Sequence, residues 1–75
     1  MVELVRYIAR SLVEKPDAVD VREVENADSV VIELRVDADD MGKVIGKQGR
    51  IAKAIRTVVK AASVNSPKPV FVELI

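Results

Sequence analysis

The spacing of hydrophobic residues changes along the chain between a helical period and the alternation of a strand. Residues 2–15 carry apolar side chains at helical spacing, which predicts an amphipathic helix that ends before Pro16. Alternation then predicts two strands, over 18–25 and 30–36, and the residues between them, 26–28, are typical of a turn. A helix followed by a β-hairpin is therefore expected in the first half of the chain.

The two predicted strands differ in regularity. In the second strand Val30, Ile32, Leu34 and Val36 face one way, and Glu33 and Arg35 face the other. In the first strand the alternation slips at Glu23 and Val24, which predicts either a bulge or the end of the strand.

The second half of the chain predicts two helices and a strand. The acidic run 37–40 offers N-cap side chains and favourable charge to a helix that begins near Met41. Gly46–Gly49 interrupts this helix within two turns, a longer helix is predicted over 49–63, and a last strand over 70–75. The order helix, strand, strand, short helix, helix, strand is that of an α+β protein.

The longer helix has an apolar face and a basic face on opposite sides. At about 100° per residue, the apolar face that we expect to join the core contains Ile51, Ile55, Val58 and Ala62. The opposite face contains Arg50, Lys53, Arg56 and Lys60. Ala52 and Val59 fall just outside the core arc. Small residues there would let a second subunit's helix pack closely, so a pairing surface around Val58, Val59 and Ala62 is one interpretation and an ordinary core edge is the other.

Charge is distributed unevenly, although twelve basic residues balance twelve acidic ones. The segment 41–72 has seven basic and no acidic residues, a charge of +7: Lys43, Lys47, Arg50, Lys53, Arg56, Lys60 and Lys68. The rest of the chain has five basic and twelve acidic residues, a charge of −7. The positive segment contains both predicted C-terminal helices, so an anionic partner is expected to bind there.

Composition narrows the possible functions. The 75 residues allow one domain, and the absence of Cys and His removes the thiolate nucleophile, the usual general base and the commonest metal ligands. An enzyme or a cofactor-dependent protein is therefore not expected. Tyr7 and Phe71 are the only aromatic residues, which argues against base-stacking platforms of the RRM type. The longest apolar runs have three residues and the N-terminus lacks a targeting pattern, so we expect a soluble cytoplasmic protein.

The segment Gly46-Lys47-Gln48-Gly49 lies between the two predicted helices. Glycine tolerates positive φ and close backbone approach, and the free N–H groups of the following helix would point into the same space, which suits a phosphate. A simple C-cap turn is the alternative, and the acid-free surroundings favour the anion site. The spacing fits neither a Walker A loop nor a dinucleotide-binding glycine motif, which disfavours a nucleotide-hydrolysing enzyme.

The run 44–51, Val-Ile-Gly-Lys-Gln-Gly-Arg-Ile, resembles the Ile-Gly-x-x-Gly signature of the KH nucleic-acid-binding domain. The order of elements matches the type II KH topology over essentially the whole chain, and a free-standing domain of this size resembles the KhpA family of small bacterial RNA-binding proteins. The resemblance implies a three-stranded sheet with helices on one face, in which 1–27 forms an N-terminal extension and 28–75 the KH core. It also implies a loop that clamps about four single-stranded nucleotides.

The resemblance assigns roles to particular residues. Gly46 and Gly49 would give close backbone approach, and Lys47 and Gln48 would donate to phosphate oxygens. Coulomb attraction would come from three further cations: Lys43, Arg50 and Lys53. Three apolar residues would build the core and the groove wall: Val44, Ile45 and Ile51. Arg56 and Lys60 lie farther along the helix, at distances of up to about 15 Å, and are interpreted as a solvated helix face rather than as direct contacts.

The acidic residues Asp37, Asp39 and Asp40 admit a second interpretation as a metal site. Read as an EF-hand loop, the sequence fails at Met41 and Gln48, where ligands are required. Helix capping explains the acids, and no metal is expected.

The expected function is non-catalytic binding of single-stranded RNA, or of single-stranded DNA, in an RNA-chaperone or post-transcriptional role. The KhpA-like resemblance implies a homodimer, or a heterodimer with a larger KH-containing protein of the Jag type. The alternative is an adaptor that uses the KH surface to assemble with a partner protein rather than with nucleic acid.

Overall fold

The computed structural model describes residues 1–42, 44, 49 and 51–75, and it gives residues 43, 45–48 and 50 only as part of a helix. Its elements are α1 Val2–Leu12, a short 3-10 helix η1 Pro16–Ala18, β1 Asp20–Glu25, β2 Val30–Arg35, α2 Ala38–Ala62 and β3 Val70–Leu74. The predicted α+β class is confirmed. The sequence predicts two helices, one on either side of the glycine segment. The structure instead assigns a single helix, α2, over the whole of this range.

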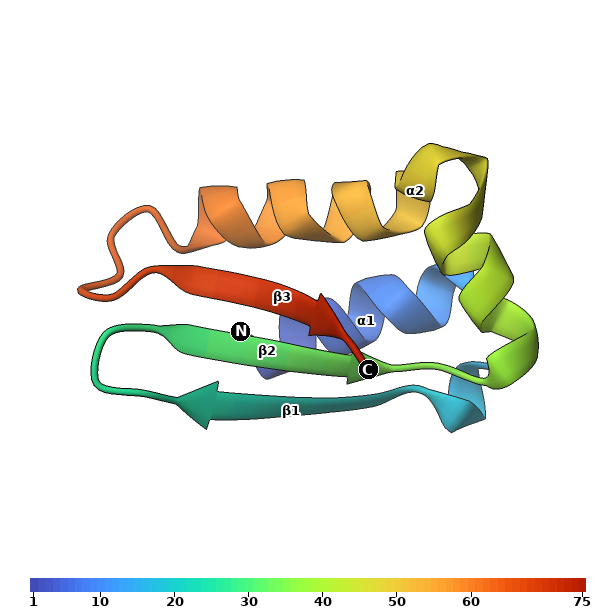
Figure 1. Ribbon diagram of the computed structural model, residues 1–75, viewed down its shortest axis with the longest axis horizontal. Helices are drawn as coiled ribbons and strands as arrows, with labels where there is room; N and C mark the ends of the chain where they lie inside the picture. Colours follow the sequence, from blue (N-terminus) through green and yellow to red (C-terminus); the bar gives the residue numbers. More distant parts are fainter.

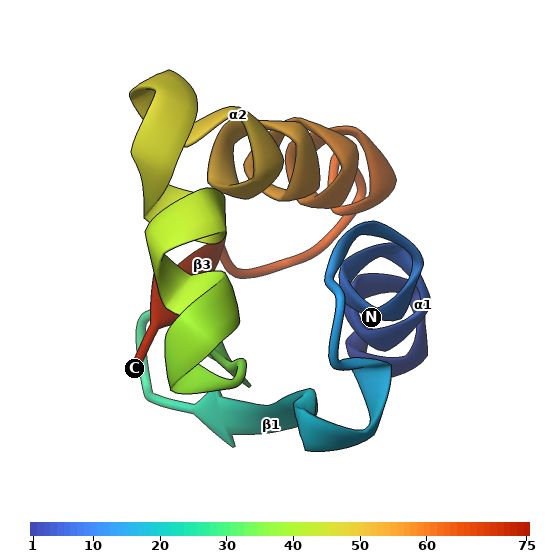
Figure 2. The same cartoon turned by 90° about the vertical axis from the view of Figure 1, so that its right-hand side faces the viewer.

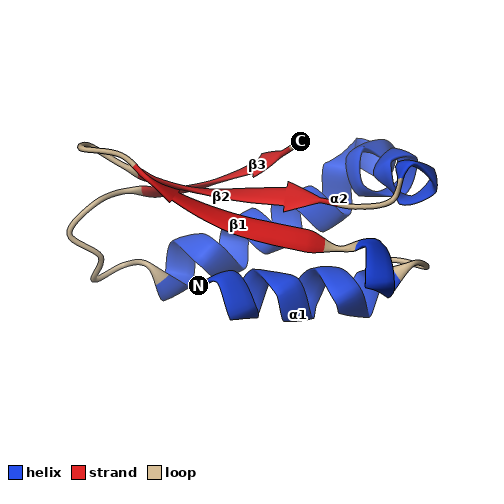
Figure 3. Cartoon of the chain, turned by 90° about the horizontal axis from the view of Figure 1, so that it is seen from below, coloured by secondary structure: helices blue, strands red, loops and turns tan.

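The three strands form one sheet in the order β1-β2-β3, with the helices on one of its faces (Figures 1 and 3). β1 and β2 are antiparallel, whereas β2 and β3 are parallel and are connected through α2. A parallel neighbour requires such a crossover, because the chain must return to the starting end of the sheet. β3 is the last strand in the order and therefore an edge strand. The second part of α2 runs alongside it (Figure 1).

The hairpin is regular, so the predicted bulge at Glu23 and Val24 is wrong. The strands pair residue for residue from Asp20 opposite Arg35 to Glu25 opposite Val30. The alternation slips because Val24 lies on the opposite face of β1 from the buried Val21, and its side chain is 40% exposed. The predicted turn is confirmed, since the backbone N–H of Asn26 donates to the carbonyl of Ser29 at 2.7 Å.

The core lies between the sheet and the helices. β2 and the residue after it contribute the buried side chains that alternation predicts, Ile32, Leu34 and Val36. α1 contributes Val5 and Ala9, but it ends at Leu12, three residues earlier than predicted. Leu12 is 47% exposed, so the last apolar residues of the predicted helix do not all reach the core.

The second part of α2 packs on the sheet through Ala52, Ile55 and Val59, which are all buried. These residues follow the i, i+3, i+7 spacing of a core-facing stripe. The stripe is rotated from the predicted one, because Val58 is 39% exposed and Ala62 is exposed. Val59 therefore belongs to the core and is not available to a second subunit. Among the described residues, no helix has the combination of length and apolar character that a membrane span needs.

Candidate nucleic-acid interface

α2 changes direction partway along its length. The first part of α2 stands at the end of the sheet and the second part runs back along β3 (Figures 1 and 2). Gly49 has φ of +65°, a conformation that lacks a steric penalty only for glycine. An ideal Cβ at this position would meet nothing within 4 Å, so the requirement for glycine comes from the backbone and not from crowding.

A groove begins at Gly49 and follows the second part of α2 along the edge of β3. It has a volume of about 590 Å³ and is lined by Gly49, Ala52, Lys53, Arg56, Thr57, Lys60 and Leu74. We call it the basic groove, because three of these residues are cations and, among the described lining residues, none is acidic. Its charge and its position beside the glycine segment suit a polyanionic chain.

Three cations follow one side of the basic groove, spaced along α2. Lys53, Arg56 and Lys60 have exposed side chains, so their charges are available to a ligand. Arg56 and Lys60 are exposed, as the predicted solvated helix face requires, and both also line the same groove as Lys53. Their position on one face of the helix follows from the sequence, whereas the groove that they share with Lys53 does not.

Thr57 and Leu74 were not identified from the sequence. The Thr57 hydroxyl donates to the carbonyl of Lys53 at 2.8 Å, one helical turn earlier, so its lone pairs remain available as acceptors. Leu74 forms the opposite wall at the end of β3. No local pattern signals that these two residues line one groove, because this depends on the crossover that places β3 beside α2.

Of the residues that the sequence assigns to the site, Gly49 and Lys53 lie in the basic groove. Val44 is buried with 1% of its surface exposed and Ile51 is half-buried, which confirms their predicted place in the core. The remaining predicted site residues lie outside the described part of the chain: Lys43, Ile45, Gly46, Lys47, Gln48 and Arg50.

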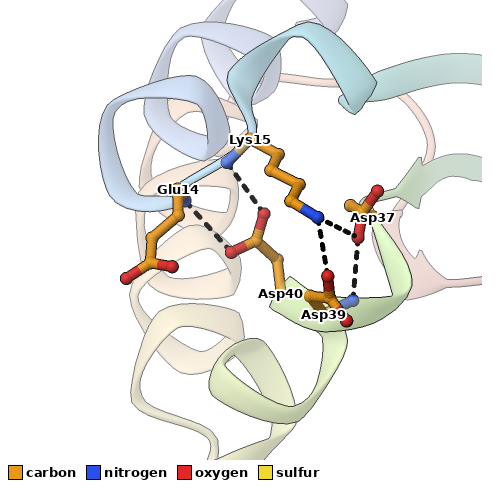
Figure 4. A network of polar contacts seen from close by, with 5 residues as sticks. All are labelled: Glu14, Lys15, Asp37, Asp39 and Asp40. Carbon is orange, nitrogen blue, oxygen red and sulfur yellow. Dashed lines mark hydrogen bonds and ion pairs between the residues drawn. The ribbon is translucent and has the colours of Figure 1, made fainter.

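The acidic residues at the start of α2 cap the helix and hold the segment that follows α1 (Figure 4). Asp37 is the N-cap, and its carboxylate accepts from the backbone N–H of Asp39 at 2.9 Å, as predicted. This hydrogen bond lowers the pKa of Asp37 below its ordinary value of 3.8, and the charge of Lys15 adds to the effect. Lys15 in turn bonds Asp39 at 2.6 Å and lies 3.5 Å from Asp37, and both contacts raise the pKa of its ammonium above 10.5.

Asp40 differs from its neighbours, because only 1% of its surface is exposed. Its two carboxylate oxygens accept from the backbone N–H groups of Glu14 and Lys15, each at 3.0 Å (Figure 4). The residue therefore fastens the end of the α1 segment to the first turn of α2. Among the described residues there is no group of three or more acidic side chains placed to hold a metal ion.

Lys68 is a cation of the positive segment that does not face the basic groove. Its ammonium lies 3.2 Å from the carboxylate of Glu25 and donates to the carbonyl of Asn26 at 2.9 Å. It thereby ties the 63–69 loop to the turn between β1 and β2. The positive charge next to β3 consequently comes from α2 and not from this loop.

Comparison with known proteins gives consistent matches over the whole chain. A family model described as KhpA/KhpB, KH domain matches residues 2–74. The RNA-binding protein KhpA of Clostridium perfringens is 63% identical over 75 residues, which cover all of both chains. The protein of the same name from Caldanaerobacter subterraneus is 60% identical, and the match covers 100% of both chains. The one from Aquifex aeolicus is 48% identical, and the match covers 97% of this chain and 92% of its own length.

A solved structure with a similar fold is that of Era in complex with MgGDPNP and nucleotides 1506–1542 of 16S ribosomal RNA. The TM-score is 0.56 and the sequence identity is 25%. The match covers 99% of this chain but only 30% of the Era chain, so the similarity concerns one part of that larger protein.

Proposed function

Because the chain belongs to the KhpA/KhpB KH-domain family, we propose that it binds single-stranded RNA, without catalysis, in the basic groove between α2 and β3. The observation that carries this proposal is the line of Lys53, Arg56 and Lys60 in a groove that begins at Gly49 and has no acidic residue among its described lining residues. Cations in such a row neutralise successive phosphates, and the released counterions favour binding. The relatives from three bacteria carry the name RNA-binding protein, which agrees with this ligand.

The glycine segment would act as the clamp. Gly46 and Gly49 let the phosphate backbone approach the chain closely, while Lys47 and Gln48 donate to phosphate oxygens. Lys43 and Arg50 add charge next to the clamp, and Ile45 contributes to the apolar wall. The positive φ of Gly49 supports this proposal, because glycine adopts this conformation without a steric penalty and its backbone can be approached closely.

The test uses short single-stranded RNA and DNA of mixed sequence. Replacing both Lys47 and Gln48 with Asp reverses the charge of the clamp, and binding by fluorescence anisotropy should fall at least tenfold while the circular dichroism spectrum stays unchanged. Arg22→Asp on β1 is the matched control, because it changes the charge of an exposed residue outside the groove and should leave affinity nearly unaltered. Wild-type protein that binds neither strand would show the proposal to be wrong.

We place the protein in the cytoplasm, where it would act as an RNA chaperone or a post-transcriptional regulator. One groove of this size neutralises about three phosphates, so log K should fall with log salt with a slope of about −2. Binding to one groove is consequently weak, and two grooves on a dimer would raise the overall affinity through effective concentration.

A protein-assembly role is the second candidate, as a homodimer or with a larger KH-containing partner of the Jag type. The observation that favours it is the exposure of Val58 and Ala62 on the side of α2 away from the basic groove. Val58→Asp should dissociate such a dimer without loss of folding. A wild-type protein that light scattering finds monomeric at tens of micromolar would exclude the homodimer.

A further inference from the structure

We propose that the open face of the sheet, which lies opposite the helices, binds a basic amphipathic helix of a partner protein. This surface is separate from the basic groove, so the inference goes beyond the proposed RNA-binding function. In the described part of the chain, α1 and the second part of α2 lie on one face of the sheet (Figure 3). The side chains on the opposite face are therefore accessible to another molecule.

A row of three apolar side chains crosses the open face. Val31 on β2 lies opposite Val24 on β1 and beside Phe71 on β3, so the three share one face. Val31 and Phe71 precede the buried Ile32 and Val72, and their side chains consequently point away from the helices. Val24 and Phe71 are 40% and 54% exposed. With neighbouring strands about 4.8 Å apart, the row is about 10 Å long, a length that about two turns of a helix cover.

A row of charged residues runs beside the apolar row. Arg22, Glu33 and Glu73 are neighbours across the three strands, about 7 Å from the apolar row. The Nη2 atom of Arg22 lies 3.5 Å from Oε1 of Glu33. Among the described residues no ion pair includes Glu73, so two neighbouring carboxylates share a single cation. Like charges at neighbouring positions destabilise a sheet, and a lysine or arginine of a partner would offset this repulsion.

The charge of the open face selects among the occupants that an apolar row could attract. The strands place three acids and two bases on this face: Asp20, Glu33, Glu73, Arg22 and Arg35. RNA and anionic membrane surfaces are negative, and both would be repelled by the pair of glutamates. A second copy packed face to face would present the same excess of acid. A helix with an apolar stripe between lysines or arginines matches both rows.

A partner on the open face leaves the basic groove accessible. Glu73 and Leu74 are adjacent in β3, and their side chains point to opposite faces of the sheet. Leu74 lines the basic groove, whereas Glu73 belongs to the open face. The domain can therefore hold RNA on one side and a partner protein on the other at the same time.

The test uses a peptide of about four helical turns that is built from leucine and lysine, with leucine at helical spacing. A second peptide has glutamate in place of every lysine. Each is titrated into isotopically labelled protein, and the backbone amide signals are followed by nuclear magnetic resonance. The lysine peptide should shift the signals of Val24, Val31, Phe71 and Glu73, whereas the glutamate peptide should leave these signals unchanged.

Three variants separate the apolar and the electrostatic contributions. Glu73→Lys should weaken binding of the lysine peptide about fivefold, because an attractive surface pair becomes a repulsive one. The same variant should resist urea better than the wild type, because lysine beside Glu33 replaces a like-charge pair by an opposite one. Phe71→Thr keeps a residue suited to a strand and should also weaken binding. Asp17→Lys makes the same change of charge on the exposed η1, outside the sheet, and should leave affinity nearly unaltered.

Each other outcome counts against the inference. A lysine peptide that shifts no open-face signal at millimolar concentration, or open-face shifts of equal size with both peptides, would overturn it. RNA affinity should be the same in Phe71→Thr and in the wild type, and a loss would assign the open face to nucleic acid. A dimer that light scattering finds only in the wild type would assign this face to a second copy. Binding of the lysine peptide by a protein that binds no RNA would leave the inference standing and overturn the proposed function alone.

Discussion

Asp40→Asn tests whether one buried carboxylate fastens α1 to α2. In the structure both oxygens of Asp40 accept backbone N–H groups at 3.0 Å, and the side chain is almost completely buried. Asparagine keeps the shape and one acceptor oxygen, but it presents an N–H₂ group to the second backbone donor. That donor then lacks a partner, and a buried unsatisfied group costs about 1–3 kcal/mol.

The expected loss of stability is about 2 kcal/mol, because relief from burying a charge offsets part of the lost hydrogen bonding. A protein of this length has a total unfolding free energy of about 4–11 kcal/mol, so this loss is a large fraction of it. For a small domain it lowers the melting temperature by about 8–16 °C.

Urea and thermal unfolding followed by circular dichroism measure the effect. Asp39→Asn is the matched control, because its side chain is 78% exposed and its surface ion pair with Lys15 is worth less than about 1 kcal/mol. If the free energy of unfolding of Asp40→Asn lies within about 0.5 kcal/mol of the wild-type value, the fastening role of this carboxylate is refuted.

Three further predictions concern single residues. In a urea titration, Gly49→Ala should destabilise the protein by about 1–2 kcal/mol, because alanine resists positive φ. Gly42→Ala should instead stabilise it by about 0.5–1 kcal/mol, because Gly42 lies in a helix and an added Cβ would meet open space. Val59→Ala should cost about 2 kcal/mol and Val58→Ala less than about 0.5, and equal costs would contradict the rotated core stripe. Because the pKa of Asp37 in the folded protein is lower than 3.8, its carboxylate contributes fully to the free energy of unfolding above pH 3.8, and this contribution is lost as the pH falls through the folded-state pKa. Asp37→Asn should therefore lose less stability than the wild type in acid titrations below pH 4.

Local patterns were sufficient for most of the fold. The alternation of Ile32 and Leu34 and the turn at Asn26 predict the hairpin, because each depends on neighbours in sequence. The rotation of the α2 stripe was not predictable in the same way. Val58 and Val59 are both apolar and adjacent, and only packing against the sheet decides which one is buried.

The candidate site divides in the same way. The glycine segment and the row of cations on α2 follow from spacing and charge, whereas the place of Leu74 in the basic groove depends on the crossover that puts β3 beside α2. The role of Asp40 was also hidden, because its partners are backbone groups 25 and 26 residues earlier in the chain. An acidic residue at the start of a helix resembles a cap whether or not it also binds another segment.

The most direct test of the RNA-binding account is a titration of isotopically labelled protein with a short single-stranded RNA, followed by the backbone amide signals in nuclear magnetic resonance spectra. The account predicts that the largest shifts fall on Gly49, on residues 52–60 of α2 and on β3, with little change in α1 and β1. Shifts concentrated on α1 or on the open face of the sheet, or no shifts at millimolar RNA, would contradict it.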